Sequence, residues 1–393
     1  MKMKTKTKTT DRTKNRQALT VGKTIILAVL SLIFIFLLAV YLFLTFYKPT
    51  FEIPDLPVLD YGNAPGFELS ESPENNKNNI KSDFYNILVV CGDNSNSNTD
   101  TIMVVSLDVK NKECSMLQIP RDTYTDHASW NKKINSAFPY GTAVARRDGK
   151  KGDEVFKAGI DALKNALWRT FGIAVHCYAY MDLDGFSEIV DIVGGVTVDV
   201  PFNMKYDDWT RGEELHINLS AGAQLLDGDK AEQYMRFRKN NDGTGYREGD
   251  VGRLKAQQQF IASLIKKCMK LDISQINKFI NTGYKYIKTD LTALNFAFFA
   301  KEFLTVDTGD ITIYTAFGED RYMKVYSPNE GKNINLSYYL AYKEEMLELV
   351  NGKFNAYNQN LTAANLDLIE FDRKSAAGAG VTGNNIDGFY DLE

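Results

Sequence analysis

The hydrophobic and polar positions along this chain predict one long apolar segment followed by a domain of short strands and helices. The segment from Ile25 to Tyr47 is uncharged and strongly apolar over 23 residues, and Lys23 and Lys48 bracket it. A helix of this length crosses about 30 Å of hydrocarbon with some tilt. We therefore expect a transmembrane helix at residues 24–47. A cleaved signal peptide fits less well, because the run is too long and no small-residue cleavage site follows it.

Beyond residue 83 the pattern changes to short apolar runs and amphipathic stretches. These are typical of an α/β or α+β fold with a central mixed sheet flanked by helices. The length of this part, residues 83–357, suits a single domain. Residues 184–200 read as a short helix, a turn at Gly194 and Gly195, and a strand. The other expected elements are strands at 86–90, 101–107, 114–119, 176–181 and 310–314, a helix at 156–170 and a helix from Asp250 onward.

Charge distinguishes the start of the chain from the remainder. Residues 1–23 carry eight Lys or Arg and one Asp, which predicts a basic tail that stays in the cytoplasm while the folded part lies outside the cell membrane. Without those nine charged residues the chain has 38 Lys and Arg against 49 Asp and Glu, a net charge of −11. This balance argues against nucleic acid as a partner.

Two other segments have the composition of flexible chain. Residues 48–82 contain four prolines before Gly66, of nine in the chain, and then Ser, Glu and Asn in low-complexity order. This composition predicts an extended linker between the membrane and the domain. Residues 358–393 are rich in Gly, Asn and Asp, so we expect a flexible acidic tail there.

The helix expected from Asp250 would begin with polar residues on a face that is apolar further along. Asp250, Arg253 and Gln257 lie within about 60° of one another at 100° per residue. The same stripe continues through the apolar residues Ile261, Leu264 and Cys268. Unpaired charges on a buried face cost on the order of several kcal/mol. These groups could pair internally with Arg236 and Arg238, or the arginines could together bind the oxygens of a phosphate group.

The two strands around the DVKNKE turn place further charged residues at one end of the sheet. With the turn centred between Lys110 and Asn111, position i pairs with position 221 − i, so Asp100 falls opposite Arg121. Asp93 can approach them across its loop. An exposed salt bridge would explain this group. Two carboxylates are also suitable ligands for Mg²⁺, which takes one or two carboxylates together with substrate phosphates.

The cysteines and histidines show no catalytic or metal-binding pattern. The four cysteines lack CxxC spacing, and the three histidines have no Ser or Asp arrangement typical of a hydrolase triad. Disulfides and buried free thiols both remain open for Cys91, Cys114, Cys177 and Cys268.

Seven sequence motifs occur in an order that resembles one family. They run from about Asn86 to Met269 and read NILVVCGD, TDTIMVVSLD, QIPRDT, KIN, DGFSEIVDIVGGVTVDVP, RFR and GDVGRxxxQ. This ordered set resembles the LytR-CpsA-Psr family of Gram-positive cell-envelope proteins. The resemblance implies one N-terminal transmembrane helix and an extracytoplasmic α/β domain. It also implies a phosphotransferase that moves an anionic glycopolymer, of wall teichoic acid or capsule type, from a polyprenyl pyrophosphate lipid to peptidoglycan.

The same resemblance assigns roles to residues of this sequence. It implies that Asp93 and Asp100 hold Mg²⁺. The residues that would grip the pyrophosphate and stabilise its charge are Arg121, Arg236, Arg238 and Arg253, and Asp250 would support these arginines at the catalytic site. The implied substrate-binding residues are Lys133, Asn135 and Gln257.

Three positions depart from the family pattern. Cys91 stands where the family has a glycine, and Asn98 and Ala256 stand in place of arginines. Each lost charge-assisted hydrogen bond would weaken phosphate binding by about 1.5–3 kcal/mol. A lipid pyrophosphatase and a non-catalytic envelope protein that binds lipid or regulates therefore remain alternatives to the transferase.

Overall fold

The computed structural model describes residues 46–54, 79–92, 99–210, 214–247, 250–373 and 383–389. The chain divides after Thr50 into two units, and all the elements below belong to the second unit, from Phe51 onward. The transmembrane helix expected at residues 24–47 lies almost wholly outside the described residues. Within the described part, no helix has both the length and the apolar composition that crossing a membrane requires.

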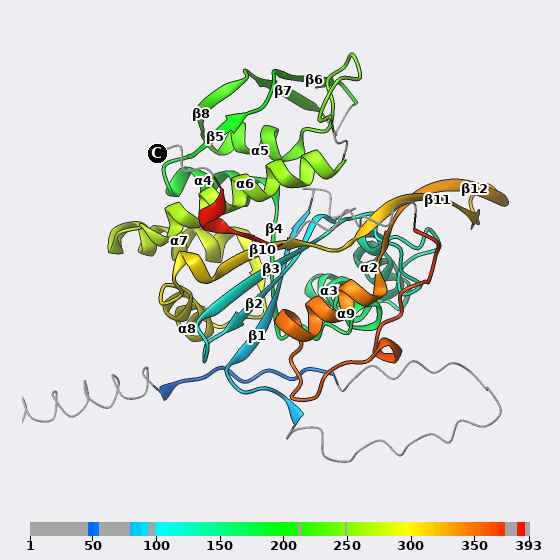
Figure 1. The fold of residues 1–393 in the computed structure, drawn as a ribbon, viewed down its shortest axis with the longest axis horizontal. Helices are drawn as coiled ribbons and strands as arrows, with labels where there is room; N and C mark the ends of the chain where they lie inside the picture. Colours follow the sequence, from blue (N-terminus) through cyan, green and yellow to red (C-terminus); the bar gives the residue numbers. More distant parts are fainter. Residues whose placement is uncertain are drawn as a thin grey trace, which may run out of the picture. The chain divides into compact units, whose positions relative to one another are not determined.

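A seven-stranded sheet forms the centre of this unit (Figure 1), with the strand order β13-β10-β3-β2-β1-β4-β9. Strands β1, β2 and β3 are antiparallel neighbours, whereas β4 pairs with β1 and β10 pairs with β3 in parallel. The expected central mixed sheet is thus confirmed. Its strands are β1 (Phe84–Gly92), β2 (Thr99–Asp108), β3 (Glu113–Ile119), β4 (Cys177–Met181), β9 (Ile287–Thr289), β10 (Ile311–Thr315) and β13 (Asn384–Asn385).

The register of β2 and β3 agrees with the one expected from the DVKNKE turn. Ile102 pairs with Ile119, and the two position numbers add up to 221 as predicted. Arg121 follows directly after this end of β3. Strand β1 ends at Gly92 and the parallel strand β4 ends at Met181, both at this same end of the sheet. Four chain segments therefore meet at one end of the sheet.

Helices cover both faces of the sheet (Figure 1). On one face, α2, α3 and α9 pack with Leu88, Val104 and Leu117 of the strands to form the main core. On the other face, α6 and α8 contact the sheet through Gln118 and Tyr85. The helices are α2 (Ala137–Arg147), α3 (Asp153–Phe171), α4 (Leu183–Ile192), α5 (Gly228–Arg236), α6 (Asp250–Met269), α7 (Ile273–Tyr286), α8 (Ala293–Phe303) and α9 (Lys343–Leu349).

A second hydrophobic cluster lies between smaller strand pairs and helices α4, α5 and α6. Val198, Ile217, Phe237 and Phe260 are buried in it. The antiparallel pairs β5–β8 and β6–β7 supply its strands, and β11–β12 form a separate long pair. These strands are β5 (Val196–Val200), β6 (Met204–Asp208), β7 (Leu215–Leu219), β8 (Gly222–Leu226), β11 (Gly318–Ser327) and β12 (Lys332–Ala341).

Several local expectations from the sequence are confirmed. Helix α6 begins at Asp250, and α3 covers the expected helix at 156–170. The turn between α4 and β5 contains Gly194 and Gly195, whose φ angles of 82° and 79° suit residues without a Cβ. All four cysteines are free thiols, and two of them, Cys114 and Cys177, are buried.

The domain extends past the expected boundary at residue 357. Leu361, Leu366 and Leu368 are buried in the main core, and β13 pairs with β10 at the edge of the sheet. The expectation of a flexible tail is therefore wrong for these residues. The polar composition of the segment concealed three leucines that belong to the main core.

The first residues of the expected linker also pack on the domain. Phe51 stacks on Phe299 with 6.1 Å between ring centroids. The hydroxyl of Tyr357 donates a hydrogen bond to the carbonyl of Pro54 at 2.6 Å. Residues 51–54 are therefore attached to the folded unit.

Asn86 and His176 connect β1 to the segment that precedes β4. The amide Nδ2 of Asn86 donates to the carbonyls of Ala174 and Phe354 at 2.9 and 2.8 Å, and its backbone N–H donates to Nδ1 of His176 at 2.9 Å. Burial lowers the pKa of His176 to about 4. The imidazole is therefore neutral in the folded domain at pH 7, as its accepting role requires.

We expect the neutral state of His176 to make stability depend on pH. In the unfolded chain its pKa is near 6.5, so below this pH the unfolded state takes up a proton that the folded state refuses until about pH 4. Stability is present above pH 6.5 and falls by up to about 3 kcal/mol as the pH drops toward 4. Denaturant titrations across this range measure the loss. The variant His176→Asn keeps an acceptor for Asn86 and should lose less stability; an equal loss in both proteins would contradict the assignment.

Replacing a core leucine of the C-terminal segment should destabilise the whole domain. Leu366 is fully buried, so Leu366→Ala should lower the free energy of unfolding by about 2–5 kcal/mol, from lost burial and the cavity left behind. The matched control Leu304→Ala changes a side chain that is 46% exposed and should cost less than about 1 kcal/mol. Equal effects in the two variants would show that residues 361–368 do not belong to the core.

Candidate functional site

A cavity of about 350 Å³ opens where β1, β2 and β4 meet α5 and α6. It is lined by all four arginines that the sequence analysis selected and by Gln257. Much of the remaining wall is apolar and includes Val89, Met103, Met181, Phe186, Ile261 and Leu264. The cavity thus joins a group of guanidinium charges to an apolar surface.

Helix α6 presents its residues to the cavity along one stripe. Arg253, Gln257, Ile261 and Leu264 all line it, which confirms the grouping expected from helical spacing. The expectation that this stripe is the buried face holds only in part, because Gln257 is buried whereas Ile261 and Leu264 are half-buried. Phe260, on another face of the helix, is fully buried in the second hydrophobic cluster. Arg253 therefore belongs to a hollow and not to a packed interior.

The described lining of the cavity is positively charged. Arg121, Arg236, Arg238 and Arg253 stand against one carboxylate, that of Glu232, which gives a formal charge of +3. Guanidinium groups that converge on one space favour an anion with several oxygens, such as a phosphate. The low dielectric of the apolar wall strengthens this preference.

An ion pair inside the cavity involves an acid that the sequence analysis missed. Arg236 donates from Nη1 to Oε1 of Glu232 at 2.8 Å. The expected partner was Asp250, whose side chain lies outside the described residues. The spacing of four residues between Glu232 and Arg236, typical of ion pairs on a helix, was the signal that could have revealed the pair.

Gln257 joins three elements through its side-chain amide. Its Oε1 accepts a hydrogen bond from Nε2 of Gln118 on β3 at 2.8 Å, and its Nε2 donates to the carbonyl of Met235 in α5 at 2.9 Å. Both ends of the amide are therefore used inside the protein. Gln257 is better suited to hold Arg253 and Arg236 in position than to contact a ligand. The contact between Gln118 and Gln257 was not predicted, because nothing in the QIPRDT motif indicates that Gln118 pairs with a residue of α6.

The segment with Lys133 and Asn135 supports Arg121 through the backbone. The N–H of Asn135 donates to the carbonyl of Arg121 at 3.2 Å, and Oγ1 of Thr99 donates to the carbonyl of Asn135 at 3.3 Å. Lys133 forms an ion pair with Asp122 at 2.9 Å. Lys133 and Asn135 are not among the described residues that line the cavity. They therefore support the backbone at Arg121 from outside the cavity lining.

The residues expected to hold Mg²⁺ fall largely outside the described part. Asp93 and Asn98 lie in the segment 93–98, which is not described, and only the backbone of Asp100 is described, within β2. Among the residues that are described, no group of three or more His, Cys, Asp or Glu side chains could hold a metal ion. Magnesium at Asp93 and Asp100 stays a prediction from the sequence.

Two positions that depart from the family pattern have different surroundings. Cys91 pairs with Thr101 between β1 and β2, and both residues line the cavity. Ala256 is 8% exposed and packs in the second hydrophobic cluster. It lines a separate cleft on another face of α6. The small side chain at this position therefore shapes a different space from the one that holds the arginines.

Removing the amide of Gln257 should destabilise the domain and disturb the arginines. Gln257→Leu leaves Nε2 of Gln118 and the carbonyl of Met235 without their partner, at a cost of about 1–3 kcal/mol for each buried group. A double-mutant cycle with Gln118→Leu, followed by denaturant titration, should show a coupling energy of at least about 1 kcal/mol. Additive effects of the two substitutions would contradict a direct contact.

Comparison with known proteins places the chain in one family. A model of the LytR_cpsA_psr family matches residues 65–352. The polyisoprenyl-teichoic acid–peptidoglycan teichoic acid transferase TagV of Bacillus subtilis is 32% identical over 199 residues, which cover 49% of this chain and 45% of TagV. The regulatory protein MsrR of Staphylococcus aureus is 29% identical over 197 residues, covering 50% of this chain and 52% of MsrR. The chain thus spans about half the length of these relatives.

Solved structures share the fold. The crystal structure of B. subtilis TagV has a TM-score of 0.51 at 24% identity and covers 69% of this chain and 95% of the other. Protein gbs0355 from Streptococcus agalactiae has a TM-score of 0.52 at 22% identity, with 70% and 89% covered. The match of the family model over most of the chain, with this shared fold, shows that the protein belongs to the LytR_cpsA_psr family.

Proposed function

We propose that this protein transfers an anionic glycopolymer, of wall teichoic acid or capsule type, from a polyprenyl pyrophosphate carrier to peptidoglycan. The observation that carries the proposal is the cavity in which four arginines adjoin an apolar wall. A lipid pyrophosphate has the same two parts, a highly charged group and a hydrocarbon chain. The relative TagV is a polyisoprenyl-teichoic acid–peptidoglycan teichoic acid transferase, which supports the proposal.

The arginines would bind the pyrophosphate and stabilise the transition state. A hydroxyl of the acceptor attacks one phosphorus atom, a new P–O bond forms, and the bond from that phosphorus to the bridging oxygen breaks. The hydroxyl proton leaves to a base, for which Asp100 and Asp250 are the candidates, and the polyprenyl phosphate departs with the bridging oxygen. Negative charge grows on that oxygen, where fixed guanidinium groups lower the barrier.

The chain's own residues would fix this geometry. Glu232 restrains Arg236 through its ion pair, and Gln257 links α6 to α5 and the sheet. When bound at Asp93 and Asp100, Mg²⁺ would neutralise part of the pyrophosphate charge. We further propose that the basic N-terminus stays in the cytoplasm, that residues 24–47 span the cell membrane once, and that the folded domain acts outside it.

Replacing Arg253 should slow transfer by about two to three orders of magnitude, because a preorganised charge donor is lost. The test incubates the protein with a polyprenyl-pyrophosphate saccharide and peptidoglycan oligomers, with and without Mg²⁺, and identifies the products by mass spectrometry. Arg147→Ala is the matched control, since that side chain is 77% exposed on α2, and it should transfer at the normal rate. Normal turnover by folded Arg253→Ala would refute the role of this arginine.

The same products decide between the proposed function and its alternatives. A phosphodiester-linked conjugate of polymer and glycan establishes the transferase. Polymer released without joining the glycan indicates a lipid pyrophosphatase, in which water takes the place of the acceptor. Tight lipid binding with neither conjugate nor polyprenyl phosphate, across several acceptors, indicates a binding or regulatory protein.

A further inference from the structure

Glu232 supplies the single carboxylate among the described residues that line the arginine cavity. It lies on α5 with Met235 and Arg236, which follow three and four positions later and line the cavity as well. Residues at this spacing share one face of a helix. The side chain of Glu232 is 25% exposed. It therefore borders the space that a ligand would enter and is not enclosed in the packed interior.

One oxygen of this carboxylate bonds to the described protein, and the other does not. Oε1 accepts a hydrogen bond from Nη1 of Arg236 at 2.8 Å. Oε2 accepts no hydrogen bond from the described residues. An ionised carboxylate accepts hydrogen bonds with both of its oxygens. The bond to Arg236 therefore orients the carboxylate, while Oε2 keeps its lone pairs for a hydroxyl group of a ligand.

The reaction proposed for the cavity needs a group of this kind. The acceptor hydroxyl must lose its proton as it attacks phosphorus, and a guanidinium group cannot take that proton. Carboxylates and imidazoles are the usual general bases of enzymes, and the described lining holds no histidine. Gln257 is a neutral amide whose two ends are already bonded inside the protein. Glu232 is thus the described lining residue best suited to accept the proton.

Glu232 has a defined position that the two bases expected from the sequence lack. The side chains of Asp100 and Asp250 lie outside the described residues. Glu232 instead lies one helical turn from Arg236, an arginine that would bind the pyrophosphate. A base at this place would be next to the phosphorus atom under attack.

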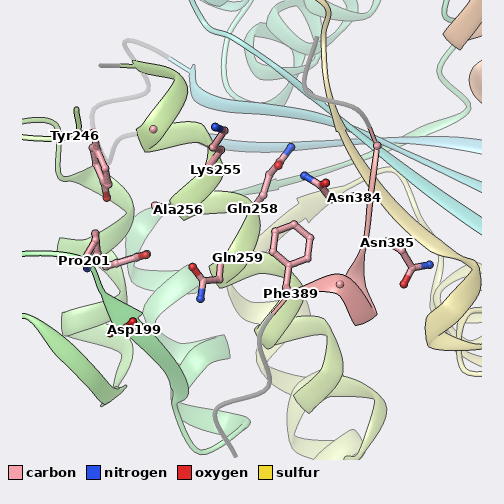
Figure 2. A pocket seen from close by; sticks show the side chains of 14 residues that line it. Asp199, Pro201, Tyr246, Lys255, Ala256, Gln258, Gln259, Asn384, Asn385 and Phe389 are labelled. Atoms are coloured by element: carbon pink, nitrogen blue, oxygen red, sulfur yellow. The ribbon is translucent and has the colours of Figure 1, made fainter. Parts of the chain in front are cut away.

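A carboxylate in another cleft beside α6 provides a contrast. Figure 2 shows Asp199, from β5, and Lys255, from α6, in this cleft. The described residues that line it include no arginine. Asp199 is exposed, and it has no cluster of phosphate-binding groups around it. The combination of a carboxylate with several arginines distinguishes Glu232.

We propose that Glu232 is the general base that activates the acceptor hydroxyl. The hydroxyl gives its proton to Oε2 while its oxygen attacks phosphorus and forms the new P–O bond. The bond from phosphorus to the bridging oxygen breaks, and the polyprenyl phosphate leaves with that electron pair. Protonated Glu232 returns its proton to water once the products have left. The inference rests on the proposed function for the identity of the acceptor, since Glu232 would deprotonate water in a pyrophosphatase in the same way.

The variant Glu232→Gln separates this role from a purely structural one, in which Glu232 only orients Arg236. Glutamine keeps an oxygen that can accept from Arg236, but its amide does not take up a proton. The substitution also raises the formal charge of the described lining from +3 to +4. It should therefore not weaken the binding of an anionic lipid, and a slower reaction cannot come from lost affinity.

Turnover and binding measured on the full chain in detergent micelles test the inference. The substrates are a polyprenyl-pyrophosphate saccharide and peptidoglycan oligomers with Mg²⁺, and released polyprenyl phosphate counts turnover with either a hydroxyl or water as acceptor. Glu232→Gln should turn over about a hundredfold more slowly, as loss of a general base does. Its Kd for the lipid, measured by calorimetry without Mg²⁺ or acceptor, should change by less than about threefold.

Two further variants sharpen the test. Asp199→Asn is the matched control, because it converts an exposed acid to its amide away from the arginines, and it should turn over at the normal rate. Glu232→Ala should be as slow as Glu232→Gln. Added formate should accelerate Glu232→Ala in a concentration-dependent way, since this small carboxylate can enter the vacated space and take the proton. Formate should not accelerate Glu232→Gln, whose side chain fills that space.

The inference and the proposed function can fail separately. The inference is overturned if Glu232→Gln turns over normally, if its Kd rises as much as its rate falls, or if formate fails to accelerate Glu232→Ala; conjugate formed by the unaltered protein would still establish the transferase. Polyprenyl phosphate released without conjugate, at a rate that depends on Glu232, would keep the base and reject the transferase. An unaltered protein that binds the lipid and releases no polyprenyl phosphate would overturn both.

Discussion

The side-chain amide of Gln257 connects the two helices that carry Arg236 and Arg253 to the central sheet. Four guanidinium groups around one cavity repel one another, so the surrounding structure must hold them in place. The carboxylate of Glu232 restrains Arg236 in this way, at the expense of one unit of positive charge. The amide instead ties α6 to β3 through Gln118 and to α5 through Met235 without changing the charge of the site. The cavity can therefore be both rigid and strongly positive.

Much of the fold could be predicted from local patterns. The pairing of Ile102 with Ile119 follows from one turn, and the stripe from Arg253 to Leu264 follows from helical spacing. Both depend on residues that are near in sequence. The sequence analysis missed Gln118, which lies 139 positions from Gln257, and nothing in either neighbourhood signals such a contact. It also misjudged Leu366, because a single buried leucine in a polar segment has no periodicity to recognise.

The site itself was predicted in its composition but not in its shape. Periodicity placed Arg253 and Gln257 on one face of α6, and the charges on that face connected them to Arg236; the family resemblance added Arg121. The separate roles of these residues became visible only in the structure. Both ends of the Gln257 amide bond to the protein itself, and Arg236 pairs with Glu232. Which residues supply charge and which supply rigidity is a property of three-dimensional contacts.

The cysteines of this domain have a consequence for its chemistry in oxidising surroundings. Burial raises the pKa of Cys114 and Cys268 to about 12, and it raises the pKa of Cys177 as well. The thiolate is the species that attacks disulfides and oxidants, and these three side chains hold almost none of it at neutral pH. Packing therefore protects the reduced state of these three thiols in the folded domain, whereas Cys91 is only half-buried and lines the arginine cavity.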